Sequence, residues 1–153
     1  MDFGRLITAM ITPFYPDGRV NYEEAQKIAA YLLEHGSDGL CVAGTTGESA
    51  TLSPVERRTL FDAVLEVTRE KGASMLAGCG ANNTAESIRL SQSAQAAGAD
   101  GVLLVTPYYN KPTQEGLFAH YQAVAQSIDL PVVLYNVPGR TGVNLLPTTV
   151  SQL

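Results

Sequence analysis

A tyrosine and an arginine flank a Pro/Gly turn that directly follows an apolar run late in the sequence. The run Pro131–Leu134 leads into Tyr135–Gly142, which reads Tyr-Asn-Val-Pro-Gly-Arg-Thr-Gly. Proline and glycine fix the backbone of such a turn, so a phenol and a guanidinium are held where a strand ends. In parallel α/β folds, ligands bind and chemistry occurs at the carboxyl ends of strands. Taken alone, the segment is explained equally well by a functional site and by a buried tyrosine beside a solvated arginine.

Two further polar clusters also follow apolar runs. Residues 43–49 read Ala-Gly-Thr-Thr-Gly-Glu-Ser, and we expect the two glycines to turn the backbone tightly and leave amides and hydroxyls free for a small carboxylate. Residues 106–112 read Thr-Pro-Tyr-Tyr-Asn-Lys-Pro, which places a pair of tyrosines in a rigid loop. A carboxylate cradle, phenols that can move protons, and an arginine for a second carboxylate together predict a site for a small keto acid.

The elements that must position these clusters alternate between β-rich and amphipathic patterns. Continuous apolar strands that alternate with helices indicate a parallel sheet covered by helices. Helix starts are marked by Ser53-Pro54-Val55-Glu56, a capping box with proline at the first helical position, and by Asn83 with Glu86 three residues later. The expected strands are 6–11, 39–43, 74–78, 101–106 and 132–135, and the expected helices are 22–35, 54–71, 84–97 and 114–128.

A repeated turn favours a barrel over an open doubly wound sheet. Gly-Ser-Asp-Gly-Leu at 36–40 and Gly-Ala-Asp-Gly-Val at 98–102 each join a helix to a strand, with the first glycine ending its helix in the left-handed conformation. No G-x-G-x-x-G and no Walker lysine follow the first strand. We therefore predict an α/β fold, the first half of a (β/α)8 TIM barrel, as one partial domain over residues 1–153 without a second domain. Because five strands fit where eight are needed, and a helix begun at Pro147 stops in its second turn, we expect the chain to be the front half of something larger.

Composition excludes several classes of function. Apolar residues make up 45% and charged residues 16%, the net charge is −5, and lysine and arginine form no run, so neither nucleic acid nor a membrane is an expected partner. The first residues lack the basic region and cleavage site of a signal peptide, and Cys41 and Cys79 lie in or beside apolar strands, so we expect a cytoplasmic protein with two reduced thiols and no metal site. His35 and His120 are expected to be surface residues.

The sequence resembles the pyruvate-dependent class I aldolases, and most closely the dihydrodipicolinate synthase family of bacterial lysine biosynthesis. The resemblance implies that pyruvate forms a Schiff base with a lysine and that its enamine attacks L-aspartate 4-semialdehyde, with no cofactor. It also implies a homodimer or homotetramer for the complete protein. The segments that carry the resemblance are Thr8–Pro13, Gly44–Ser49, Thr106–Lys111, Tyr135–Gly142 and Leu145–Pro147.

Roles follow from the resemblance motif by motif. Thr45 and Tyr135 would form a proton relay, which Tyr109 would complete from a neighbouring subunit. Thr46 and its amide would hold the pyruvate carboxylate, and Arg140 would bind the carboxylate of the semialdehyde.

One element of the family's site is missing. The Schiff-base lysine of the family lies on the sixth strand, which this chain does not reach, and its lysines are Lys27 and Lys71 on expected helices and Lys111 in a loop. Two alternatives therefore stay open: a non-catalytic half-barrel or assembly unit, and a sialic-acid lyase or keto-deoxy-sugar aldolase of the same superfamily. Arg140 favours the synthase, since a semialdehyde has a carboxylate to bind and a sugar chain has mostly hydroxyls.

The resemblance also bears on regulation by lysine. Family members inhibited by lysine bind it at a subunit interface, and the matching acceptor positions are kept, whereas Pro54 and Arg57 replace two histidines. Proline offers no hydrogen bond and Arg57 would repel a cationic ligand, so we expect no inhibition by lysine; the alternative for Arg57 is a solvated position in the first turn of its helix. The kept positions are Ser49, Ala50, Asn82, Glu86 and Tyr108.

Overall fold

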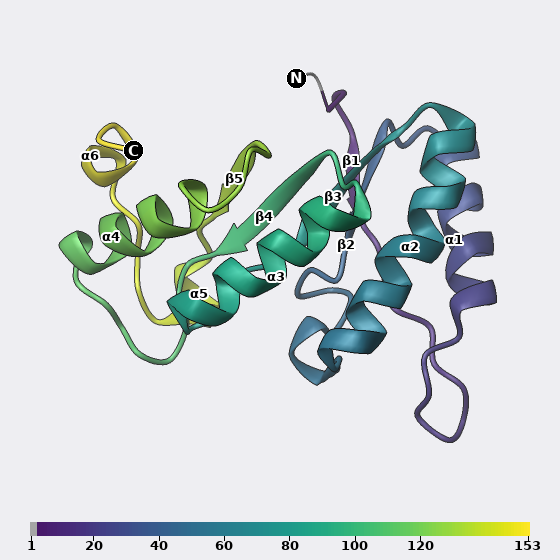
Figure 1. Ribbon diagram of the computed structural model, residues 1–153, viewed down its shortest axis with the longest axis horizontal. Coiled ribbons are helices and arrows are strands. Elements are labelled where there is room, and N and C mark those ends of the chain that lie inside the picture. Colours follow the sequence, from purple (N-terminus) through teal and green to yellow (C-terminus); the bar gives the residue numbers. More distant parts are fainter. Residues whose placement is uncertain (1–2) are drawn as a thin grey trace.

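Five parallel strands form a single curved sheet in which each strand pairs with the next strand of the chain. The computed structural model describes residues 3–153, and the strand order is β1-β2-β3-β4-β5 (Figure 1). Every pairing is parallel, with Ala9 opposite Cys41, Cys41 opposite Leu76, and Leu103 opposite Val133. The strands are β1 (Ile7–Ala9), β2 (Gly39–Val42), β3 (Ser74–Gly78), β4 (Gly101–Val105) and β5 (Val132–Tyr135).

Four long helices connect the strands and cover the outer face of the sheet. Each packs against the next along the chain, so the helices follow the curve of the sheet (Figure 1). They are α1 (Tyr22–Glu34), α2 (Pro54–Lys71), α3 (Thr84–Ala97) and α4 (Gln114–Ala125). Three single-turn elements complete the chain: η1 (Ser49–Thr51), α5 (Pro138–Thr141) and α6 (Pro147–Val150).

The hydrophobic core lies between the sheet and its helices. Its members come from alternate strand positions and from the inward stripes of the helices, as a parallel βα architecture requires. Fully buried examples are Leu40, Val42, Leu60, Phe61, Val64, Met75, Val102, Leu104 and Leu117. The opposite face of the sheet lines an open hollow of about 300 Å³, with Ile7, Ala9, Cys41, Leu76, Leu103 and Val133 on its wall. This hollow is the concave inner face of the half-barrel.

Helix starts agree with the cap signals. The side chain of Ser53 accepts from the backbone N–H of Glu56 while Glu56 accepts from that of Ser53, so the expected capping box is present. Asn83 accepts from the N–H of Glu86, but the Glu86 carboxylate pairs with Arg89 instead of returning to the cap. Both features fix where a helix leaves the carboxyl edge of the sheet.

The repeated Gly-x-Asp-Gly turn has a structural role in both copies. Gly36 and Gly98 have φ of 103° and 89°, as expected for the left-handed conformation. The carboxylate of Asp38 accepts from the backbone N–H groups of Arg5 and Leu6, and that of Asp100 accepts from the N–H of Met75. Each aspartate therefore ties the start of its own strand to the start of the preceding strand.

Several strand and helix ends differ from the sequence predictions. β1 ends at Ala9 rather than residue 11, because Thr12 turns away to bond Gly47 and Pro13 has no N–H to pair. β2 ends at Val42 because Ala43 adopts φ 54°. β4 ends one residue early at Val105, and α4 ends at Ala125 rather than residue 128. The expected turn at 138–141 is a single helical turn begun by Pro138.

One surface prediction was right and one was wrong. His35 is exposed, but His120 is only 6% exposed, and its ring nitrogen Nδ1 hydrogen-bonds Thr84 Oγ1 at 2.9 Å. Helix α4 turns His120 inward because α3 packs on that side, and burial lowers the pKa of the imidazole. Cys41 and Cys79 are both buried free thiols. Within residues 3–153, no helix combines the length and apolarity that crossing a membrane demands.

Candidate functional site

The Gly44–Ser49 loop takes its shape from residues beside the glycines rather than from the glycines themselves. Positive φ occurs at Ala43 (54°) and Glu48 (53°), whereas Gly44 and Gly47 are absent from the left-handed region, which corrects the expected reason for their presence. Gly47 fits closely, because a Cβ there would lie 3.0 Å from the Met10 carbonyl oxygen, a tight contact that would require a small shift. The loop is thus pressed against the strand-end backbone of β1.

The two threonines of this loop have free polar groups. Within the described chain, neither the backbone N–H nor the hydroxyl of Thr45 or Thr46 has a protein hydrogen-bond partner, and both residues are exposed. The amides further along are used, since Gly47, Glu48 and Ser49 donate to carbonyls inside the loop. The uncommitted donors at 45 and 46 are suited to an incoming carboxylate.

Tyr135 ends β5 with its side chain on the concave face. Its carbonyl oxygen accepts from both the backbone N–H (3.0 Å) and the hydroxyl (3.2 Å) of Thr106, and that hydroxyl in turn accepts from the phenol of buried Tyr121 (3.1 Å). The phenol of Tyr135 has no protein partner among the described residues. It lines the 300 Å³ hollow together with Thr45 and Thr46, although no hydrogen bond joins Tyr135 to Thr45.

Arg140 lies on the short helix α5, which a set of side-chain bonds fixes in place. The side chain of Asn136 hydrogen-bonds the side chain of Asn144 and both the N–H and the carbonyl of Leu145. The hydroxyl of Thr141 lies within hydrogen-bond distance of the carbonyls of Val137 and Val143 and accepts from the N–H of Val143. Arg140 is exposed and forms no ion pair in residues 3–153, and it lines a second hollow of about 310 Å³ that also contains Thr45. Thr45 therefore links the two hollows at the carboxyl edge of the sheet.

Tyr109 lies outside both hollows. It is 87% exposed, has φ of 70°, and lines neither hollow, while its backbone N–H donates to Thr141. Neighbouring Lys111 also has positive φ (49°) and is exposed. Lys27 and Lys71 form exposed ion pairs on helices, as expected. None of the three lysines lines either hollow.

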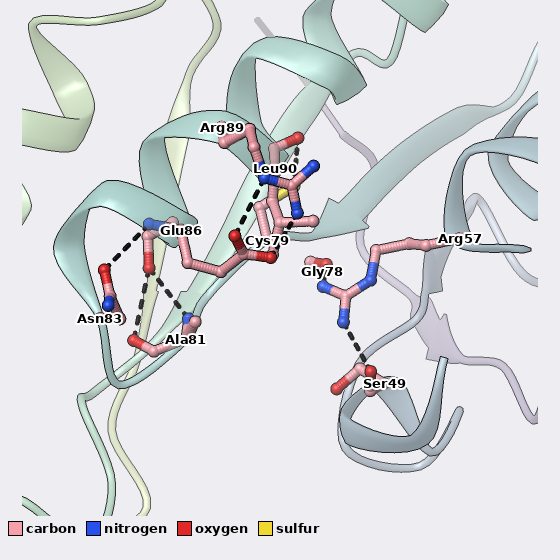
Figure 2. A network of polar contacts seen from close by, with 10 residues as sticks. Ser49, Arg57, Gly78, Cys79, Ala81, Asn83, Glu86, Arg89 and Leu90 are labelled. Carbon is pink, nitrogen blue, oxygen red and sulfur yellow. Dashed lines mark hydrogen bonds and ion pairs between the residues drawn. The ribbon is translucent and has the colours of Figure 1, made fainter. Parts of the chain in front are cut away.

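Three of the positions that the resemblance assigns to lysine binding, Ser49, Glu86 and Tyr108, lie near a buried arginine. Ser49, Ala50 and Tyr108 line the 310 Å³ hollow. Arg57 is only 7% exposed, so the solvated alternative is wrong; its guanidinium donates to the carbonyls of Ser49 (2.5 Å) and Gly78 (3.1 Å), as Figure 2 shows. Across from it on α3, Glu86 pairs with Arg89 (Figure 2). At the remaining position, Asn82, the backbone carbonyl accepts a hydrogen bond from the side-chain amide of Asn110.

Burial sets the electrostatics around Arg57. Desolvation lowers the pKa of Arg57, an effect that the nearby Cys79, Glu86 and Tyr108 oppose. Burial likewise raises the pKa of the Cys41 thiol to about 11 and that of Cys79 to about 12, so both stay protonated at neutral pH. In residues 3–153, no three His, Cys, Asp or Glu side chains gather where they could hold a metal ion.

Sequence reasoning missed the residues that support the site. The motifs identify Thr106 only as part of a loop and do not identify Tyr121, and they predict for Arg57 either a charge that repels lysine or a solvated position. A usable signal was present for Arg57, since its position in α2 places it on the same stripe as Leu60, Phe61 and Val64, which face the core.

A curved parallel sheet, helices on its outer face, and polar groups at the carboxyl ends of the strands define an enzyme fold of the (β/α)8 class, of which this chain forms the amino-terminal half. The chain belongs to the dihydrodipicolinate synthetase family, whose sequence pattern matches residues 2–153. The 4-hydroxy-tetrahydrodipicolinate synthase of Desulforamulus reducens is 56% identical over 153 residues, which cover 100% of this chain and 51% of that protein.

Solved structures agree. A chloride-inhibited dihydrodipicolinate synthase from Acinetobacter baumannii, complexed with pyruvate, matches with a TM-score of 0.96 and 44% identity, covering 99% of this chain and 52% of that one. The enzyme from Cyanidioschyzon merolae with lysine bound matches with a TM-score of 0.94 and 48% identity, covering 96% and 50%. The chain thus spans about half the length of the relatives it matches.

Proposed function

We propose that this chain supplies the amino-terminal half of the active site of a 4-hydroxy-tetrahydrodipicolinate synthase, which condenses pyruvate with L-aspartate 4-semialdehyde. The observation that carries the proposal is the set of uncommitted polar groups at one rim. Thr45, Thr46 and Tyr135 share a hollow, and none of their side-chain hydroxyls has a protein partner in residues 3–153. Nearby polar side chains such as Thr106 and Asn136 are fully engaged in support.

Each free group has a place in the chemistry. The amide and hydroxyl of Thr46 hold the carboxylate of pyruvate, while a lysine from the rest of the barrel forms the Schiff base with its keto carbon and the keto oxygen leaves as water. Thr45 and Tyr135 carry protons to and from the reacting atoms, because a hydroxyl and a phenol can each donate and accept. The enamine that results attacks the aldehyde carbon of the second substrate.

Arg140 and Tyr109 serve the second substrate and the relay. The guanidinium of Arg140 pairs with the carboxylate of the semialdehyde, a charge-assisted contact that planar forks form well. Tyr109 reaches into the site of a neighbouring copy, which accounts for a tyrosine that has a left-handed backbone conformation and an exposed side chain. The complete protein is therefore a homodimer or homotetramer.

A chimera tests the proposal. The chain is joined to the carboxyl-terminal half of the Desulforamulus reducens relative, and both the chimera and the chain alone are assayed for condensation of the two substrates. We expect turnover by the chimera and none by the chain alone. A folded chimera without turnover would contradict the proposal, and cleavage of a sialic acid by it would support the lyase alternative instead.

A further inference from the structure

The Gly44–Ser49 loop is held in a conformation that its own sequence does not favour. Ala43 and Glu48, at its two ends, are non-glycine residues in the left-handed region. Such residues persist only where surrounding contacts over-determine them, and they concentrate at functional sites. The contacts that fix this loop are therefore candidates for a functional role.

Two side chains from outside the loop bond its backbone. Thr12, buried after β1, donates its hydroxyl to the Gly47 carbonyl at 2.7 Å. Arg57, on the first turns of α2, donates to the Ser49 carbonyl at 2.5 Å. The two hydrogen bonds therefore connect the end of the loop to the segment after β1 and to α2.

Arg57 also hydrogen-bonds the end of β3, against which the loop packs. Its second nitrogen donates to the carbonyl of Gly78 at the end of β3, so one guanidinium bridges the β2 loop and β3 (Figure 2). A Cβ at Gly78 would lie 2.0 Å from the Ala43 carbonyl oxygen and 2.9 Å from the Gly44 nitrogen. The strained end of the loop therefore lies directly on a strand position that only glycine fits.

Packing alone does not account for Arg57. In the described chain its guanidinium forms no ion pair, and its Nε is buried without a hydrogen-bond partner. Burying an arginine in this way is costly, and a methionine of similar length would fill the space without that cost. A methionine could not form the hydrogen bonds to the carbonyls of Ser49 and Gly78.

We propose that Thr12, Arg57 and Gly78 form a loop brace, whose function is to position Thr46 for the substrate carboxylate and Thr45 for proton transfer. Arg57 is a positioning residue in this account, since it touches the backbone of the loop and not the reacting groups. The inference rests on the proposed function, because it assigns to Thr46 the task of holding pyruvate.

Hydrogen exchange on the chain itself tests the brace directly. In the Arg57→Met variant, the amides of Gly47, Glu48 and Ser49 should exchange at least about tenfold faster, relative to the amides of β3 and β4, than in the unaltered chain. Arg58→Met is the matched control, because Arg58 neighbours Arg57 on the same helix but pairs with Asp62 at the surface. Equal acceleration of loop and strand amides, or no acceleration of the loop, would overturn the brace.

A second variant keeps the test decisive if Arg57→Met does not fold. Thr12→Val removes the hydroxyl while it keeps the shape of the side chain, so the bond to Gly47 is lost with no change in charge. The same three amides should exchange faster, by a smaller factor. Loop amides that keep their rates in Thr12→Val would count against the brace.

The chimera then shows whether the brace positions the substrate. Arg57→Met should raise the KM for pyruvate at least about tenfold with a smaller change in kcat, whereas Arg58→Met should leave both near their starting values. A faster-exchanging loop with an unchanged KM would contradict a positioning role. If the unaltered chimera has no activity, the proposed function fails, while the exchange experiment still decides whether the brace exists.

Discussion

At the scale of single residues, the site is a contrast between engaged and free polar groups. Thr106 and Tyr121 hold the carbonyl of Tyr135 through consecutive hydrogen bonds, and the Tyr135 phenol is left free on the concave face. A rigidly held backbone with a free acid–base group is the arrangement that proton transfer requires. We therefore expect the rate of proton transfer to depend strongly on the Tyr135 phenol.

The phenol of Tyr135 should be essential for rate and dispensable for folding. In the chimera, Tyr135→Phe should lower kcat by roughly 10²–10⁴-fold, because phenylalanine keeps the ring and removes the proton carrier. Tyr31→Phe, at an exposed tyrosine on α1, is the control and should have no effect. Steady-state kinetics provide the measurement, and a nearly unaltered rate in Tyr135→Phe would remove Tyr135 from the relay.

Arg140 should discriminate between the two substrates. Arg140→Ala should reduce kcat/KM for the semialdehyde by at least about tenfold and leave the KM for pyruvate nearly unchanged, since only the former loses a charge-assisted pair. Arg19→Ala, which removes an exposed arginine distant in sequence from the rim, controls for the loss of charge. An equal loss for both substrates would argue against the assigned role.

Buried His120 should make the stability of the fold depend on pH. Burial holds its pKa below the unfolded value of about 6.5, so the unfolded state binds more protons in the window below that value. The free energy of unfolding should therefore fall as the pH drops through 6.5 toward the folded pKa, and it should be unaffected by His120 at higher pH. Urea titrations between pH 5 and 8 measure this.

The same titrations on two variants assign the effect. His120→Gln should flatten the dependence in that window, whereas His35→Gln, at an exposed histidine, should keep it. An unchanged slope in His120→Gln would mean that other groups cause the acid loss of stability.

At the scale of elements, the sequence predicted what depends on local pattern. Every long helix and strand was found, and helix starts at Ser53 and Asn83 follow from cap chemistry that acts over three residues. Strand ends were less accurate, because they depend on distant partners, such as the bond from Thr12 to Gly47 that draws the chain out of β1.

In the candidate site, too, the sequence predicted what depends on local motifs and missed what depends on distant partners. The motifs placed Thr45, Thr46, Tyr135 and Arg140 at the carboxyl edge of the sheet, where the structure has them. The position of Arg57 on the buried stripe of α2 indicates its burial, but its partners are backbone carbonyls of Ser49 and Gly78, which the sequence alone does not identify.

The buried position of Arg57 on α2 leads to a prediction on regulation. With its guanidinium bonded to Ser49 and Gly78 beside Glu86 and Tyr108, a fixed positive charge stands among the positions considered for lysine binding. A cationic ligand would be repelled, so the chimera should keep its activity when lysine is titrated at saturating pyruvate. Strong inhibition below about 1 mM lysine would show that Arg57 moves out of the way.

At the scale of the whole molecule, the chain provides one side of a barrel. β1 and β5 each pair with a single strand of the described sheet, and the concave hollow between them holds free hydroxyls but no lysine. A Schiff base needs an amine that is desolvated and close to the keto carbon, which exposed Lys27, Lys71 and Lys111 do not offer. We therefore expect catalysis only from this half together with its complement.

Reductive trapping measures that property most directly. The chain alone and the chimera are each treated with pyruvate and borohydride, and the mass of the intact protein is then determined. The account predicts one pyruvate adduct on the chimera, located by peptide mapping in the segment donated by the relative, and no adduct on the chain alone. An adduct on Lys111 of the isolated chain, or a folded chimera that forms none, would contradict it.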